Sequence, residues 1–208
     1  MSAPRPTITV EAKPFIPYVA EKDYPERLRP VLEPYITRMG FVPNALKLYM
    51  YRPEIAETLW KLNSLIMRDT SSTLDQFLKR KLAAVASAIN GCAYCTAHCC
   101  SMLKKPVGVD AEGWALSDQE LQGILAGALP PKDELERVCY DYVRAASEDP
   151  SSVPREILDR LAKHLTPPQI VELACLVGFW KFYNTVHDSL HVPIETQVLS
   201  DTGYVNLV

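Results

Sequence analysis

Apolar residues recur at helical spacing along most of the chain. After Pro53, a favourable helix start, they are separated by three or four positions, at Ile55, Leu59, Leu62 and Ile66. Thr73 and Gln76 form a capping box, and a broad apolar face then repeats with the same period, at Leu74, Phe77, Leu78, Leu82, Val85 and Ile89. Both patterns predict amphipathic α-helices.

The second of these helices is followed by a glycine and then by a cluster of cysteines. Gly91 is expected to close the helix as a left-handed cap, because glycine adopts positive φ without strain. A further helix is expected to begin at about residue 92 and to run to about residue 104. Residues 105–116 are expected to form a loop.

The remaining sequence predicts more helices and no sheet. Ser117 and Glu120 form another capping box, for a short helix to about residue 126. Longer helices are predicted from Pro130-Pro131 to Ser147, from Pro154 onward, and from Thr166 through Phe182. Residues 7–10 form too short a run to support a sheet. The predicted class is therefore all-α.

Proline is concentrated at the start of the chain. Residues 1–34 hold seven of the seventeen prolines, and proline fixes φ and removes a backbone donor. We expect residues 1–24 to form an extended N-terminal arm and residues 25–208 to form a single helical domain.

Composition narrows the functional classes. The formal net charge is −3, which gives no reason to expect a nucleic acid or an acidic membrane as partner. No stretch approaches the roughly 20 apolar residues that cross a bilayer, and the first ten residues do not form a signal peptide. The basic run Lys79-Arg80-Lys81 is interpreted as a solvated helix face.

Six cysteines are present, and four of them lie within Cys92–Cys100. Such clustering differs from the spaced disulfide framework of small secreted proteins. It points to redox chemistry or to metal binding, and a cytoplasmic location is expected. Cys139 and Cys175 are interpreted as buried packing residues.

The spacing of Cys92 and Cys95 suits thiol chemistry. At the start of a helix, two cysteines three residues apart bring their sulfurs within bonding range. Free N–H groups and the helix dipole favour the thiolate there, which is the form that attacks a peroxide or a disulfide. One cysteine is then oxidised to a sulfenic acid and the other resolves it as a disulfide. No organic cofactor and no metal are needed for this reaction.

A zinc site is the alternative interpretation of the cluster. Cys92, Cys95, His98 and Cys99 are a legitimate set of zinc ligands. Four ligands within one continuous helix diverge around its axis, however, whereas structural zinc sites draw ligand pairs from separate elements.

The cysteine segment also resembles a known family. Residues 88–98, Ala-Ile-Asn-Gly-Cys-Ala-Tyr-Cys-Thr-Ala-His, resemble the core of the AhpD-like branch of the carboxymuconolactone decarboxylase family. Residues 40–44, Gly-Phe-Val-Pro-Asn, resemble the G-x-V-P-N element that precedes this core. Residues 182–188 resemble the F-x-N-x-x-x-D element near the C-terminus. The likeness covers about residues 25 to 195.

This resemblance implies an AhpD-like helical fold, a homo-oligomer (a trimer or hexamer) and the reduction of an alkyl hydroperoxide. Cys95 would attack the peroxide and Cys92 would resolve the product, with Tyr94 between them as a supporting residue. A thiol or dithiol partner would then reduce the disulfide. The decarboxylases proper generally lack this cysteine pair, so its presence favours the peroxidase-related branch.

Two positions depart from the family pattern. The family's proton relay uses a glutamate twelve residues before the first cysteine, where this chain has Arg80, and a histidine four residues after the second, where it has Cys99. Arg80 would instead stabilise a thiolate or be solvated. Cys99 would be a second resolving thiol or a packing residue. His98 is the candidate replacement base, three residues after Cys95.

His187 and Asp188 reach the thiols only if the last long helix packs over them. Otherwise Asn184, His187 and Asp188 form a solvated patch, which is the commoner arrangement. Two rival functions stay open because of the changed relay. One is a lyase or isomerase of the decarboxylase type that acts on a small cyclic acid, and the other is a non-catalytic oligomeric subunit.

Overall fold

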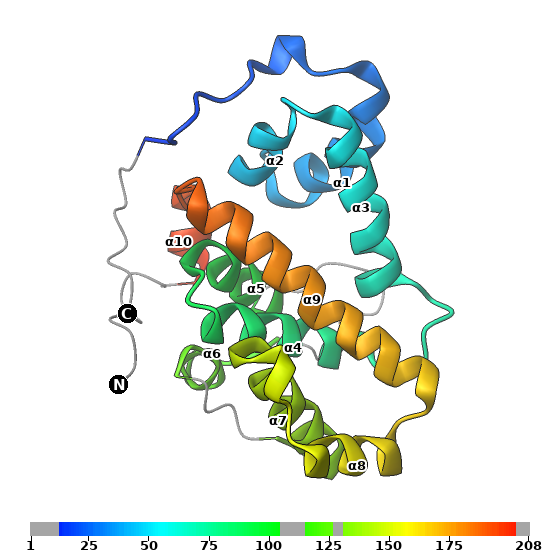
Figure 1. The fold of residues 1–208 in the computed structure, drawn as a ribbon. Coiled ribbons are helices and arrows are strands. Elements are labelled where there is room, and N and C mark those ends of the chain that lie inside the picture. Colours follow the sequence, from blue (N-terminus) through cyan, green and yellow to red (C-terminus); the bar gives the residue numbers. More distant parts are fainter. Residues whose placement is uncertain (1–12, 105–114, 127–130, 203–208) are drawn as a thin grey trace.

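The structure is a computed structural model and describes residues 13–104, 115–126 and 131–202. In these ranges every regular element is helical, which confirms the all-α prediction (Figure 1). The α-helices are α1 (Arg29–Met39), α2 (Asn44–Tyr49), α3 (Pro53–Arg68), α4 (Gln76–Ile89), α5 (Ala93–Lys104), α6 (Asp118–Leu125), α7 (Glu134–Glu148), α8 (Arg155–His164), α9 (Pro167–Ser189) and α10 (Thr196–Thr202). Single turns of 3₁₀-helix lie at Glu21–Asp23, Glu26–Leu28 and Pro150–Ser152.

Helices α4 and α5 lie at the centre of the molecule (Figure 1). Helices α1–α3 lie together at one end of the molecule, α7 and α8 lie at the other, and the long helix α9 runs past both groups. Most of α4 is buried, and its apolar side chains join those of α5, α7 and α9 in one core. A smaller apolar cluster forms between α1, α3 and the residues before α2. The cysteine cluster therefore lies in the most enclosed part of the fold.

The predicted connection between α4 and α5 is confirmed. Gly91 has a φ of 78°, a left-handed conformation that suits glycine. The chain reverses at this glycine, so that α5 packs against α4 directly after the turn.

One predicted capping box and one predicted helix start are confirmed, and two predicted starts are wrong. Ser117 with Glu120 caps α6 as predicted, and α9 starts after Thr166, which forms a capping box with Gln169. By contrast, α4 begins at Gln76 with Asp75 as its cap, because the Asp75 carboxylate accepts from the Leu78 amide at 2.7 Å. Helix α7 likewise begins after a capping aspartate, Asp133, and not at Pro131.

The interpretation of Lys79 and Lys81 as solvated is wrong. Lys79 is 0% exposed and pairs with Glu172 of α9, 2.9 Å away. Lys81 is 6% exposed and pairs with Glu136 of α7. Because α4 is central, both faces that carry these lysines are covered by other helices, and each ammonium group meets a carboxylate from the covering helix.

The interpretation of Cys175 as buried is also wrong, because it is exposed on α9, whereas Cys139 is buried as predicted. Trp60 and Trp180 pack in apolar clusters. Trp114, residues 7–10 and most of the predicted loop 105–116 lie outside the described residues.

The described part of the N-terminal segment lies against the helices. The Tyr51 hydroxyl donates to the Pro17 carbonyl at 2.7 Å, and Ile16 packs against the main core. The division of the chain at residue 24 stays a prediction.

None of the helices in the described ranges combines the length and apolar character that a bilayer-spanning segment requires.

Candidate active site

Cys92 precedes the first residue of α5 and takes the capping position. Its carbonyl accepts from the Thr96 amide at 3.0 Å, the first hydrogen bond of the helix, and its sulfur accepts from the Cys95 amide at 3.4 Å. A capping side chain normally binds the amide three residues ahead in this manner. The helix start therefore fixes Cys92 relative to Cys95.

Both cysteines are free thiols, and they lie 3.3 Å apart. Cys92 is 0% exposed and Cys95 is 2% exposed. The hydrogen bond with Cys95, together with burial, raises the pKa of the Cys92 thiol far above its ordinary value. Cys92 is therefore protonated at neutral pH.

Cys95 contacts a histidine from the far end of the chain. The Cys95 sulfur lies 3.1 Å from Nδ1 of His187 on α9, and Nε2 of the same ring lies 3.1 Å from the Tyr49 hydroxyl on α2. Burial lowers the pKa of His187 to about 4. At neutral pH the ring is therefore uncharged. Nδ1 can then accept a proton, while Nε2 keeps the ring in place through its hydrogen bond with the Tyr49 hydroxyl.

Aromatic side chains hold the His187 ring on two sides. Tyr183, one turn earlier on α9, stacks on it with ring centroids 5.3 Å apart and an angle of 16° between the planes. Tyr94 meets it edge-on at 5.1 Å. These contacts fix the direction in which Nδ1 points.

A second buried network centres on Glu195, just before α10. One carboxylate oxygen accepts from the Asn44 amide at 2.5 Å and from the Tyr94 hydroxyl at 3.0 Å. The other oxygen lies 2.7 Å from Nε2 of His98. Burial works to raise the pKa of Glu195, but the neighbouring His98 and the backbone amides outweigh it and hold the pKa below its ordinary value. Glu195 therefore remains a carboxylate and orients His98.

Asn44, the last residue of the Gly-Phe-Val-Pro-Asn element, links two distant parts of the chain. Besides its amide bond to Glu195, its side chain donates to the Pro193 carbonyl at 2.9 Å. The start of α2 and the segment before α10 are thereby joined, 149 residues apart in sequence.

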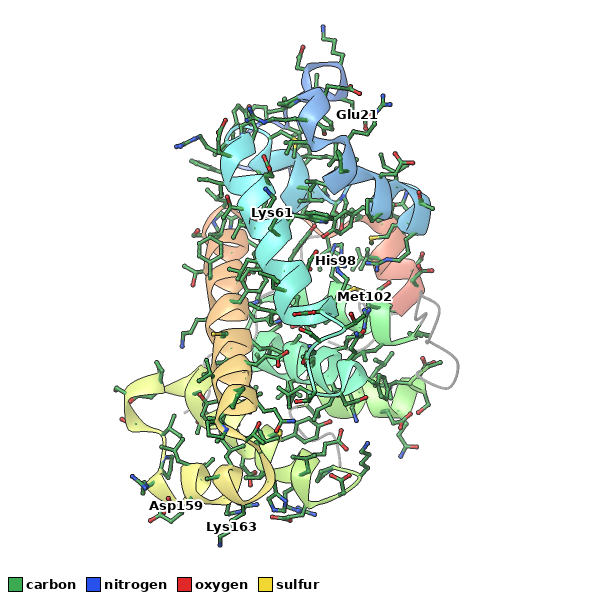
Figure 2. All side chains as sticks on the ribbon, turned by 90° about the vertical axis from the view of Figure 1, so that its right-hand side faces the viewer. Glu21, Lys61, His98, Met102, Asp159 and Lys163 are labelled. Atoms are coloured by element: carbon green, nitrogen blue, oxygen red, sulfur yellow. The ribbon has the colours of Figure 1, made fainter. Side chains whose placement is uncertain are left out.

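A cavity of about 120 Å³ opens beside the thiol pair. Of the residues that the sequence singles out, five line it, namely Arg80, Tyr94, Cys95, His98 and His187. Cys92, Cys99 and Asp188 are not among its lining residues. In Figure 2, His98 and Met102 lie near each other in the middle of the molecule, at the level where α3 meets the α4–α5 pair. A small molecule in this cavity would reach Cys95 and not Cys92.

The two altered relay positions have different surroundings. Cys99 is 1% exposed, and burial raises its pKa well above the ordinary value, which fits a packing residue. Arg80 is half-buried and lines the cavity, with Nη1 3.7 Å from the Met102 sulfur. Its guanidinium is thus a positive charge at the site and not a solvated surface group.

The expected solvated patch on α9 is mostly buried. Asn184 and His187 are enclosed, and only Asp188 is exposed. The Asn184 side chain accepts from Asn90 at 2.7 Å and donates to Ser87 at 3.3 Å, which ties α9 to the end of α4.

Asp188 extends this contact to the thiols. Desolvation raises the pKa of Asp188 above its ordinary value, although the nearby Cys92 thiol opposes the change.

Sequence reasoning missed four residues of this site, namely Tyr49 and Glu195 of the two networks, and Arg38 and Arg68, which also line the cavity. None has a spacing relative to the cysteines that a sequence pattern could reveal, since each comes from a different element. The zinc alternative gains no support, because His98 is turned toward Glu195. Within the described ranges, no three histidine, cysteine or acidic side chains converge in a way that would hold a metal ion.

No protein-family profile matches the sequence. No curated protein matches it either.

Several solved structures are similar in fold. The apo debrominase Bmp8 superimposes with a TM-score of 0.74 at 21% identity, over 90% of this chain and 96% of that one. A peroxidase-related protein with an alkylhydroperoxidase AhpD core, from Ralstonia eutropha JMP134, gives 0.75 at 16% identity, over 91% and 96%. A peroxidase-related protein from Silicibacter sp. TM1040 gives 0.74 at 20% identity, over 90% and 97%. At these identities the likeness establishes the architecture: the chain has the helical fold of the AhpD-like, peroxidase-related proteins.

Proposed function

We propose that this chain is a thiol-dependent hydroperoxide reductase of the AhpD-like type, with Cys95 as the attacking thiol and Cys92 as the resolving thiol. One observation carries the proposal. The Cys95 sulfur lies on the wall of a cavity, 3.1 Å from an uncharged histidine nitrogen and 3.3 Å from a second free thiol.

In the first step, Nδ1 of His187 accepts the proton of the Cys95 thiol. The thiolate attacks the terminal oxygen of the hydroperoxide, the O–O bond breaks, and the leaving alkoxide takes the proton back from His187. The hydroperoxide is reduced to an alcohol and Cys95 is oxidised to the sulfenic acid.

In the second step, the Cys92 sulfur attacks the sulfenic sulfur of Cys95. Asp188, whose carboxylate is near the Cys92 thiol, accepts the thiol proton and passes it to the departing hydroxide, so that a disulfide forms and water leaves. A thiol or dithiol partner then donates two electrons and regenerates both thiols. His98, oriented by Glu195, contributes a polar group to the cavity wall and positions the substrate oxygen.

Loss of free thiols on exposure to an organic hydroperoxide tests this proposal. The reduced protein should lose two thiols for each hydroperoxide consumed, and Cys95→Ser should abolish the fast loss. Cys175→Ser is the matched control, because Cys175 is an exposed thiol outside the cavity, and this variant should react as the parent does. Undiminished thiol loss in Cys95→Ser would remove Cys95 from the mechanism.

A reductive dehalogenation is the second candidate, favoured by a specific comparison. A cysteine-to-alanine variant of debrominase Bmp8, in complex with 2,3,4-tribromopyrrole, superimposes on this chain with a TM-score of 0.73. The same thiol pair would supply the electrons: an aryl bromide and two thiols give the arene, hydrogen bromide and a disulfide. Bromide release from 2,3,4-tribromopyrrole, measured beside hydroperoxide consumption, distinguishes the two reactions.

The non-catalytic alternative requires thiols that are closed off from any cavity, which is not the situation of Cys95.

We also propose a homo-oligomer and a cytoplasmic location. Exposed apolar residues on α9 support the first, and the unpaired state of all six cysteines supports the second.

A further inference from the structure

Three arginines from three different helices line the cavity that holds Cys95. Arg38 comes from α1, Arg68 from α3 and Arg80 from α4. Arg38 and Arg80 both contact Met102 of α5, with nitrogen-to-sulfur distances of 3.5 Å and 3.7 Å. Figure 2 shows Met102 beside His98, in the same inner region of the molecule. Two of the arginines therefore meet at Met102, and Arg68 lines the same cavity.

The positive charges are close enough to repel one another. Burial lowers the pKa of Arg38, and the neighbouring Arg68 lowers it further. Burial likewise lowers the pKa of Arg80, with added repulsion from Arg38 and Arg68. Half-buried guanidinium groups in mutual repulsion destabilise the empty cavity, and an anion between them would remove that cost.

The bonds that Arg38 and Arg68 make are to neutral groups. Arg38 bonds the Met102 thioether, and Arg68 donates to the Asn63 amide oxygen at 2.6 Å. A thioether is a weak acceptor and an amide carries no charge. Planar guanidinium groups bind a carboxylate far more strongly, through two parallel hydrogen bonds.

The rest of the lining is largely aromatic. Tyr35, Tyr49, Tyr183 and Trp180 contribute rings, and Met67 adds an apolar side chain. The volume of about 120 Å³ is close to the roughly 150 Å³ of an engineered cavity that binds benzene. The cavity therefore suits a molecule with a single ring.

The separation of the arginines from the thiol fits the same kind of molecule. Met102 lies seven residues after Cys95 on α5, which is about 10 Å along the helix axis. A benzoate spans about this distance from a guanidinium nitrogen to a sulfur in contact with its far ring edge, counting two non-covalent contacts of about 3 Å.

We infer that the cavity binds a single-ring aromatic carboxylate, whose anionic group is held by Arg38, Arg68 and Arg80 and whose opposite end is directed at Cys95. Its reactive end, a hydroperoxide or a halogen, rests on the proposed function, whereas recognition of the carboxylate does not depend on the chemistry at Cys95. The substrate class is thus an acidic aromatic compound and not a neutral alkyl hydroperoxide.

Calorimetric titration of the reduced full-length protein in Tris chloride buffer tests this inference, with benzoate as the probe. Benzamide is its neutral isostere, and inorganic phosphate is an anion without a ring. Benzoate should bind at least about tenfold more tightly than either. Arg38→Gln and Arg68→Gln should each remove most of this preference, whereas Arg29→Gln, an exposed arginine on α1, should leave it unchanged.

Equal binding of benzoate and benzamide would overturn the inference, and so would absence of benzoate binding. Phosphate binding as tight as that of benzoate would overturn the aromatic class. Two arginine variants are used so that the test still holds if one of them misfolds. Thermal denaturation of each variant checks that it is folded. Cys95→Ser should bind benzoate like the parent. If benzoate binds but neither hydroperoxide is consumed nor bromide released, only the proposed function is rejected. If hydroperoxide is consumed or bromide released but benzoate does not bind, only the anion site is rejected.

Discussion

Burial decides the protonation state of His187, and that state gives the residue its proposed role. An exposed histidine has a pKa near 6.5, so part of it would be charged at neutral pH and unable to accept a proton. The rings of Tyr94 and Tyr183 enclose His187 and lower its pKa to about 4. The imidazole nitrogen next to Cys95 therefore stays available as a base across the neutral range.

Replacement of His187 by glutamine should lower kcat/KM for hydroperoxide by roughly 10²- to 10⁴-fold, the usual contribution of a positioned base. The rate of Cys95 alkylation by iodoacetamide should fall as well, because less thiolate is present. His164→Gln is the control, since His164 is exposed at the end of α8. An unchanged alkylation rate in His187→Gln would exclude His187 as the base.

The same residue makes stability depend on pH. The unfolded chain protonates His187 below about 6.5, whereas the folded protein does so only near 4. Between these values the unfolded state binds more protons, so the free energy of unfolding falls as the pH falls. The contribution is fully present above pH 6.5 and amounts to about 3 kcal/mol.

Urea denaturation at pH 7 and at pH 4 measures this contribution. The parent protein should lose about 3 kcal/mol more than His187→Gln does between the two pH values. Equal losses in both proteins would show that His187 is not held neutral by the fold.

Glu195 is the residue on which the other buried network depends. Glu195→Ala should lower the free energy of unfolding by about 3 kcal/mol, because it leaves the Asn44 amide and the Tyr94 hydroxyl without their acceptor. Glu195→Gln should cost less, since an amide oxygen can still accept from both. Chemical denaturation checks the order of the two variants. Glu33→Ala, at an exposed position of α1, should change stability by less than about 0.5 kcal/mol.

At the scale of the elements, α4 holds the fold together through charge as well as apolar contact. Lys79 joins it to α9 and Lys81 joins it to α7, and each lysine is buried beside a single carboxylate. Glu136 is further held by the Lys132 amide and the Tyr140 hydroxyl, both at 2.7 Å. Such pairs fix how helices pack, because either charge alone in the core is costly.

Glu136→Ala should therefore lower the free energy of unfolding by about 3–5 kcal/mol, since Lys81 is left charged and without its carboxylate. The double variant Lys81→Met, Glu136→Ala should recover part of this loss, because the stranded charge is gone. Thermal and chemical denaturation of the single and double variants measure the coupling. Lys61→Met, which breaks an exposed pair with Glu57, should cost less than about 1 kcal/mol. A double variant less stable than Glu136→Ala would contradict this account.

At the scale of the whole molecule, apolar side chains remain on the surface of α3 and α9. Leu65 is 61% exposed and Val171 is 62% exposed, and Leu62 and Phe182 are exposed as well. Phe182 also borders a groove between α7 and α9. Exposed apolar groups gathered on long helices are typical of subunit interfaces.

If α9 forms the subunit interface of the proposed oligomer, Phe182→Glu should shift the protein toward the monomer, because it introduces a charge into an apolar contact. Sedimentation velocity at several concentrations measures the change. Glu156→Lys, an exposed charge reversal on α8, should leave the distribution of species unaltered. A parent protein that sediments as a monomer at all concentrations would reject the oligomer.

The helices could be predicted because helix formation depends on residues that are close together in the sequence. Capping residues and a period of 3.6 are read within a few positions of one another, so the turn at Gly91, the capping box of α6 and the start of α9 could be predicted from the sequence. Errors arose where two caps competed, as at the start of α4, where Asp75 prevails over Thr73.

The sequence by itself determined the helical class, the closeness of Cys92 to Cys95 and their place at the start of a helix, because all three depend on residues that are near one another in the chain. Only the tertiary structure decided that His187, and not the nearer His98, contacts Cys95, that Glu195 orients His98, and that three arginines share a cavity. These partners are up to 97 positions apart, and a periodic pattern reports which face of a helix is buried but not which side chain covers it. The buried lysines of α4 show the same limit, since their charges become part of the core only when α7 and α9 supply carboxylates.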